Sequence, residues 1–193
     1  MLDILIKNAT LPDGRTGQSI AIQGDRIVEV GPAVTGDAGR VIDAGDCLVT
    51  PPFIDPHLHL DSTLSLGEPR LNQSGTLLEG IQLWGELKPH LTGDAIKQRV
   101  RELARWSIAK GTLAIRSHVD TSDPRLLNVD ALIEVREELK PYIDIQLVAF
   151  PQDGYFRSPG AVENLTLALD KGVDVVGGIP HFERTMEDGA RSV

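Results

Sequence analysis

The pattern of hydrophobic and polar residues changes near residue 50. Before that point, short β-prone runs are divided by Gly and Asp, namely DILIKNA, QSIAIQGDRIVEVG and RVIDAGDCLVT. Gly24 and Asp25 fall inside the second run and favour a tight turn there. Residues 1–50 are therefore predicted to form a small antiparallel sheet, a β-sandwich lobe.

Beyond residue 50, apolar runs of strand length alternate with segments of helical periodicity. The clearest helix spans residues 92–111, with Thr92 or Asp94 to cap its start and Gly111 to close it. Further helices are predicted in GTLLEGIQLWGEL, PRLLNVDALIEVREELKP and SPGAVENLTLALDKG, and ERTMEDGARSV begins a loop or a helix. Strands are predicted in LVTPPFI, TLAIRSHVD, YIDIQLVAFPQ and VDVVGGIPH.

The order β-α-β-α-β-α-β predicts a parallel sheet in the second part of the chain. Four such units are half of an eight-unit barrel, which usually takes ~250 residues. Residues 51–193 are therefore predicted to be the first four βα units of a (β/α)8 TIM-type barrel, in the N-terminal part of a longer chain. Later strands would complete the 1–50 lobe. A four-stranded doubly wound domain is the structural alternative.

Polar residues gather where the predicted strands end. His57 and His59 are two residues apart, so on a buried strand both side chains point the same way. Two imidazoles on one face can bind one Zn²⁺ or Fe²⁺ ion, which would still need further ligands. Packing at a strand end is the alternative interpretation. His118, Gln152 and His181 end the other three strands, at the edge where parallel α/β folds place their active sites.

The sequence alone leaves several roles open. His118 could support a metal ligand or contact substrate, and direct metal binding is the less favoured alternative. His181, followed by Glu183, could bind metal, orient another group or be structural. Asp61 could brace a metal ligand from behind, or be an ordinary loop carboxylate. Gln152 offers an amide donor and acceptor to a pocket, against the alternative of a surface turn.

The helical pattern also predicts which tryptophans and charged segments are buried or exposed. Both Trp84 and Trp106 fall on apolar helix faces; Trp84 could line a pocket, and Trp106 is predicted to belong to the core. The segments KQRVREL and EVREEL are predicted to be solvated helix faces.

Composition and charge exclude several classes of function. A net charge of −9 and a pI near 5.0 argue against a nucleic-acid or anionic-membrane surface. No apolar run reaches membrane-spanning length, and the start of the chain does not have a signal-peptide pattern. Cys47 is the single cysteine, so there is no internal disulfide and no CxxC metal site. A cytoplasmic protein is expected, and a homo-oligomer remains an open alternative.

Several stretches resemble a known family. The run TPPFIDPHLHLD, with its HxH at the end of a strand, resembles the amidohydrolase superfamily. PHLHLD, NQSGTLLEGI, SHVD, LVAFPQ and VVGGIPHFE together resemble its cytosine deaminase branch. The resemblance implies one divalent ion, iron or zinc, with His57 and His59 as ligands. It also implies that Gln152 binds the carbonyl edge of a pyrimidine and that the Leu77 backbone carbonyl accepts from the ring N–H.

The function implied by this resemblance is hydrolytic deamination of a free, nucleobase-like small molecule. Cytosine or isocytosine would give a carbonyl product and ammonia. The general acid/base glutamate and the metal-binding aspartate are expected beyond Val193, so the segment would be active only with a missing C-terminal half. One alternative is an s-triazine or other cyclic amidine aminohydrolase of the same superfamily. Another is a truncated, non-catalytic binding or assembly subunit, which the intact mass of the native protein would distinguish.

Overall fold

The computed structural model describes residues 1–193, which separate into two compact units, Met1–Pro51 and Pro52–Val193. Each unit has a hydrophobic core of its own. None of the helices combines the length and the apolar character that crossing a membrane requires.

The N-terminal unit is one four-stranded sheet in the order β3–β2–β1–β4. Its strands are β1 (Leu2–Ala9), β2 (Gln18–Gln23), β3 (Arg26–Gly31) and β4 (Ala38–Asp43). The predicted hairpin turns at Gly24, but β4 pairs parallel to β1, so the prediction of a purely antiparallel sheet was wrong. The chain after β3 returns to the start of β1, where the Leu2 N–H donates to the Asp37 carbonyl, and β4 must then run the same way as β1.

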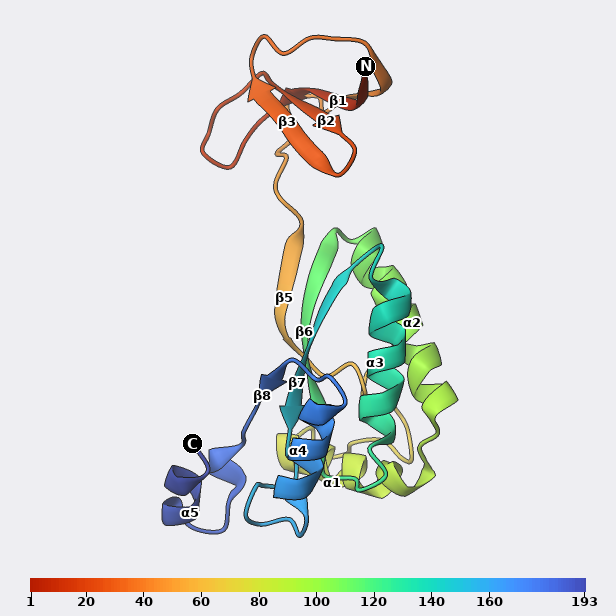
Figure 1. Cartoon of the computed structure of the whole chain (residues 1–193), viewed down its shortest axis with the longest axis vertical. Coiled ribbons are helices and arrows are strands. Elements are labelled where there is room, and N and C mark those ends of the chain that lie inside the picture. Colours follow the sequence, from red (N-terminus) through yellow and green to blue (C-terminus); the bar gives the residue numbers. More distant parts are fainter. The chain divides into compact units, whose positions relative to one another are not determined.

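The second unit contains the predicted parallel sheet, in the order β5–β6–β7–β8 (Figure 1). Its strands are β5 (Phe53–Leu58), β6 (Thr112–Asp120), β7 (Asp144–Phe150) and β8 (Val175–Val176). Sequential order and parallel pairing confirm the βα succession expected for the first half of a (β/α)8 barrel.

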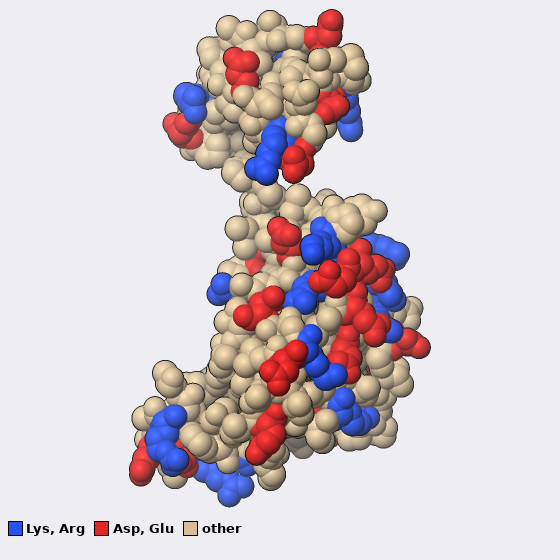
Figure 2. All heavy atoms as spheres, in the orientation of Figure 1, with Lys and Arg blue, Asp and Glu red and all other residues tan.

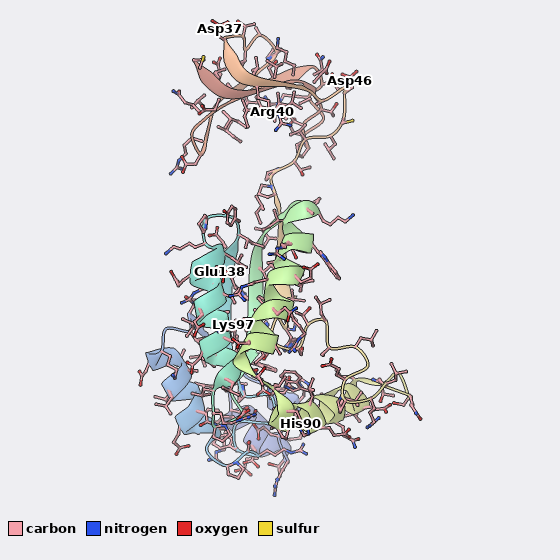
Figure 3. The ribbon with its side chains drawn as sticks, turned by 90° about the vertical axis from the view of Figure 1, so that its right-hand side faces the viewer. Asp37, Arg40, Asp46, His90, Lys97 and Glu138 are labelled. Carbon is pink, nitrogen blue, oxygen red and sulfur yellow. The ribbon has the colours of Figure 1, made fainter.

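Helices separate these strands, and all four predicted segments are helical. The elements are α1 (Leu77–Leu87), η1 (Lys88–His90), α2 (Gly93–Ala109), α3 (Leu127–Leu139), α4 (Ala161–Asp170), η2 (Pro180–Phe182) and α5 (Met186–Arg191). Helices α2 and α3 lie side by side along the sheet, and α1 lies at the carboxyl end of the strands (Figures 1 and 3). The Thr92 side chain caps α2, as one of the two predicted caps.

Charged side chains cover the outer surface of α2 and α3, as predicted. Lys97 pairs with Glu134, and Arg101 with Glu138, so each ion pair joins the two helices. Blue and red side chains are interspersed on the face of the second unit that Figure 2 shows. On this face there is no broad basic patch of the kind that a nucleic-acid phosphate backbone would require.

One prediction of burial was wrong, and the condition of a buried strand that was set for the HxH motif is not met. Trp106 is 51% exposed, because α2 turns the face of Ile96, Val100 and Ala104 inward and carries Trp106 outside that face. Its indole N–H donates instead to Glu102, one helical turn earlier. The strand of the HxH motif is an edge strand that pairs only with β6, and its Phe53 is 61% exposed rather than buried.

Gly177 allows β8 to approach β7 closely. A Cβ at this position would lie 2.7 Å from Val148 Cγ1 and 2.9 Å from the Ala149 carbonyl oxygen. We expect Gly177→Ala to lower the free energy of unfolding by about 1–3 kcal/mol, measured by urea denaturation. Gly85→Ala is the control, because its Cβ would meet nothing within 4 Å in α1, and it should stabilise by about 0.5–1 kcal/mol. Equal effects of both substitutions would contradict the close approach.

Candidate metal centre and its pocket

Three histidines meet at the carboxyl ends of β5 and β6. His57 lies in β5, His59 directly follows it, and His118 lies in β6. One candidate ligand atom from each ring lies within 4.8 Å of the other two. The rings of His57 and His118 are 4.1 Å apart between centroids, and each is 5.5 Å from the ring of His59. The two strands are parallel neighbours, so their ends reach the same edge of the sheet.

The pairing of β5 with β6 is irregular at the histidines. The register shifts between Asp55 and Leu58, so the strict alternation of side chains does not hold over the HxH motif. His57 is exposed while His59 is half-buried, yet the two rings remain neighbours. The sequence spacing brings the pair together as predicted, although on an irregular strand end rather than on a buried regular strand.

The environment keeps two of these imidazoles neutral, which is the form that binds a metal. Burial, followed by the nearby charges of His57 and His59, lowers the pKa of His118 to about 4. Burial and His57 also lower the pKa of His59. His118 Nδ1 is buried and has no hydrogen-bond partner. An unpaired buried nitrogen within a cluster of three imidazoles is a donor set that suits a divalent ion such as zinc or iron.

The Asp61 side chain bonds to backbone N–H groups near the ends of two strands and not to a histidine. The carboxylate is almost fully buried, accepts from the Asp120 N–H at 2.8 Å and accepts from the Ser62 N–H at 2.9 Å. Burial raises its pKa to about 7. Asp61 therefore fixes the chain after His59 against the end of β6 through these backbone contacts.

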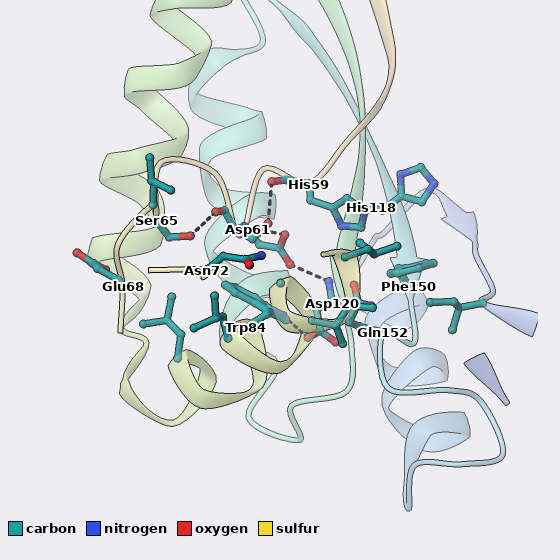
Figure 4. Close-up of a pocket in the computed structure, with 18 of the residues that line it drawn as sticks. His59, Asp61, Ser65, Glu68, Asn72, Trp84, His118, Asp120, Phe150 and Gln152 are labelled. Atoms are coloured by element: carbon teal, nitrogen blue, oxygen red, sulfur yellow. Dashed lines mark hydrogen bonds between the residues drawn. The ribbon is translucent and has the colours of Figure 1, made fainter. Parts of the chain in front are cut away.

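A cavity of about 600 Å³ opens beside the three histidines (Figure 4). Of the residues predicted from the sequence, Leu77, Trp84, Gln152 and His181 all line it. Trp84 is buried, Gln152 is half-buried beyond β7, and His181 is exposed in η2. Phe150 also lines it, with its ring edge-on to His59 and His118 at 5.5 Å between centroids.

Some residues of the pocket carry contacts that sequence reasoning missed. The Trp84 indole N–H donates to the buried Asp120 carboxylate at 2.7 Å, and Lys88 Nζ lies 3.1 Å from the same oxygen. Both Phe150 and Asp120 end strands, which was a usable signal. Lys88 carried no such signal, because it follows a helix and most lysines are solvated.

Glu183 has a structural role in the chain after β7. Its carboxylate accepts from the backbone N–H groups of Tyr155, Phe156 and Arg157. Its oxygens are therefore occupied by this loop rather than aimed at the histidines. Of the alternatives left open for the pair His181 and Glu183, the structure supports a loop-fixing role for Glu183 and a pocket position for His181.

The segment 62–76 covers part of the cavity and is anchored to α1. The Arg70 guanidinium bonds to Glu79 and Glu86, while the Ser74 hydroxyl and N–H both donate to Glu79. These hydrogen bonds, from Ser74 first and then from Arg70, lower the pKa of Glu79 to about 2. Glu79 accepts from both Ser74 and Arg70 and is therefore the main anchor of the segment on the helix, with Glu86 as a second partner of Arg70.

The stability that Glu79 gains from these hydrogen bonds should be fully present above its ordinary pKa of 4.5. It should disappear as the pH falls toward about 2 and the carboxylate is protonated. We expect the amide resonance of Ser74, followed by NMR, to stay constant from pH 6 to 4 and to move only as the pH approaches about 2. Glu79→Gln should remove this transition. A midpoint near 4.5 would show that the anchor is absent in solution.

The comparisons with known proteins agree on one family. A model of the amidohydrolase family matches residues 40–187. The crystal structure of 5-methylcytosine deaminase from Klebsiella pneumoniae, liganded with 5-fluorocytosine, is 41% identical with a TM-score of 0.91, over 97% of this chain and 46% of that protein. That of N-isopropylammelide isopropylaminohydrolase from Burkholderia multivorans is 31% identical with a TM-score of 0.75, over 92% and 45%.

A curated relative extends the comparison. N-isopropylammelide isopropyl amidohydrolase from Pseudomonas sp. (strain ADP) is 34% identical over 186 residues, which are 92% of this chain and 45% of that protein. The chain thus spans about half the length of each of these relatives, and it matches their N-terminal half.

Proposed function

Because the chain belongs to the amidohydrolase family, we propose that it forms part of a metal-dependent hydrolase that deaminates a free pyrimidine-type base. Cytosine or isocytosine would give a carbonyl product and ammonia. The observation that carries this proposal is a shared cavity. Gln152 and the three clustered histidines all line it. The 41% identity to a deaminase crystallised with 5-fluorocytosine favours a pyrimidine over other rings.

The proposed metal ligands in this chain are His57 and His59. His118 offers a third imidazole nitrogen within 4.8 Å of the ligand atoms of the other two, and its unpaired Nδ1 supports a role toward the ion. A bound zinc or iron ion would act as a Lewis acid and lower the pKa of a water molecule for attack on the amine-bearing ring carbon. The chain's own contribution is to hold the imidazoles together at one edge of the sheet.

The other pocket residues would bind and orient the ring. The Gln152 amide can donate to a ring carbonyl and accept from a neighbouring N–H. The Leu77 backbone carbonyl, in the first turn of α1, is proposed to accept from a second ring N–H. Trp84 and Phe150 supply flat apolar walls suited to an aromatic ring. His181 is exposed and lines the same cavity, where it could contact the bound ring.

An s-triazine aminohydrolase of the same family is the second candidate. The two N-isopropylammelide enzymes, at 34% and 31% identity, favour it. A triazine and a pyrimidine present similar amide edges, so Gln152 could bind either. A non-catalytic subunit would have the same fold but would need neither a bound metal nor turnover.

Ammonia release separates these functions. The native polypeptide that carries these residues, loaded in turn with zinc and with iron, is incubated with cytosine, isocytosine and ammelide. We expect about one metal ion per chain, ammonia from cytosine or isocytosine, and loss of activity after chelation that the metal restores. Faster release from ammelide would favour the triazine enzyme. A metal-free protein that releases no ammonia from any ring would favour the non-catalytic subunit.

A further inference from the structure

Lys88 is a buried lysine that bonds to two carboxylates. It lies in η1, directly after α1, and its side chain is only 11% exposed. Its Nζ lies 3.1 Å from Asp120 Oδ2 and also bonds to Asp153. Burial lowers the pKa of Lys88, but Asp120 and Asp153 outweigh it and leave the pKa raised, so the side chain is a cation. A buried cation requires such partners, because an unpaired charge is costly away from water.

Asp120 connects Lys88 to the wall of the pocket. Its Oδ2 accepts from the Trp84 indole N–H at 2.7 Å (Figure 4). Its Oδ1 accepts from the Ser122 N–H at 2.7 Å. Asp120 ends β6, while Trp84 lies in α1. The carboxylate therefore holds the indole against the end of the strand, and Lys88 neutralises the charge that does so.

Asp153 connects Lys88 to the residue proposed to bind the pyrimidine edge. It directly follows Gln152 in the chain after β7. Its N–H donates to the Ser122 hydroxyl at 2.9 Å, so a hydrogen bond from backbone to side chain joins the chains that leave β6 and β7, in addition to the link through Lys88. The backbone of Gln152 is also held on the side of β7, because its N–H donates to the Phe150 carbonyl.

We propose that Lys88 is a positioning residue of the pocket, which fixes the Trp84 indole through Asp120 and the Gln152 amide through Asp153. It touches neither substrate nor metal in this role. The proposal rests on the proposed function only for the identity of the ring that Gln152 binds. The inward placement of Trp84 is a separate consequence that can be measured with no substrate present.

The test uses Lys88→Met, which removes the charge and keeps most of the length, in a Trp106→Phe background. Trp84 is then the single tryptophan within residues 1–193, which contain two. We expect its fluorescence emission to shift to longer wavelength as the indole gains access to water. Cytosine titrated into the metal-free protein, where it is not turned over, should bind about tenfold more weakly. The affinity for zinc should stay within about twofold of the unsubstituted protein.

Two further variants isolate the role of Lys88. Asp153→Asn keeps the buried pair of Lys88 with Asp120, so cytosine binding should weaken while the Trp84 emission stays unchanged. Lys97→Met removes a lysine that pairs with Glu134 on the surface between α2 and α3, and it should change neither reading. Asp153→Asn alone decides the matter if Lys88→Met does not fold.

The outcomes distinguish this proposal from the proposed function. Unchanged cytosine affinity in folded Lys88→Met and in Asp153→Asn would overturn the positioning role. If the unsubstituted protein binds no cytosine, the proposed function fails instead. In that case the Trp84 emission tests the positioning role of Lys88 by itself. A shift in Lys88→Met supports the role, and an unchanged spectrum overturns it.

Discussion

Replacing either His57 or His59 with alanine should weaken zinc binding by at least about a hundredfold. Each substitution removes one nitrogen from a cluster whose ligand atoms lie within 4.8 Å of one another. The remaining donors cannot move in to replace it, because His59 and His118 are held by the ends of two paired strands. Isothermal titration with zinc measures the affinity and the number of ions per chain.

The fifth histidine of the chain supplies the control. His90 lies in η1, is exposed and is outside the cluster, so His90→Ala should leave zinc binding unchanged. His118→Ala tests direct metal binding by His118, the less favoured of the roles that the sequence left open. A loss as large as that of His57→Ala would make His118 a ligand, while a loss below about tenfold would make it a neighbour that only packs on His57. Full zinc affinity after loss of both His57 and His59 would contradict the metal centre.

Much of the fold could be predicted because its elements are encoded locally. The helix α2 follows from its apolar spacing and its Thr92 cap, and the parallel sheet follows from the alternation of strands with helices. The parallel pairing of β1 with β4 could not be predicted, because it depends on where a loop returns the chain. The exposure of Trp106 depends on which face of α2 meets the sheet, which periodicity leaves uncertain by one position.

The candidate site also has a part that local sequence predicts and a part that depends on distant residues. The pair of His57 and His59 is local, two residues apart, and the sequence alone identifies it. The approach of His118 depends on the register between β5 and β6, and no residue pattern within either strand specifies that register. Lys88 is more remote still, because its partners Asp120 and Asp153 are distant in sequence and come together only after folding.

Asp120→Ala should lower the free energy of unfolding by about 3–5 kcal/mol, among the largest effects expected in this chain. The side chain is 2% exposed, and its loss leaves the ammonium of Lys88 with only the part-exposed Asp153 as a carboxylate partner and the Trp84 indole N–H unpaired. Urea denaturation measures the change. Asp130→Ala is the control, because Asp130 pairs with Lys171 where both side chains are over 40% exposed. Such a surface pair contributes about 0–1 kcal/mol.

The double variant Asp120→Ala with Lys88→Met identifies the cause of this loss. If most of it comes from the charge left on Lys88, removing that charge should restore about 1–3 kcal/mol relative to Asp120→Ala alone. Asp120→Asn should cost less than Asp120→Ala, since an amide oxygen can still accept from the Trp84 indole. A loss in Asp120→Ala no larger than that in Asp130→Ala would mean that Lys88 and Trp84 find water instead. The carboxylate would then not be the group that holds the pocket wall.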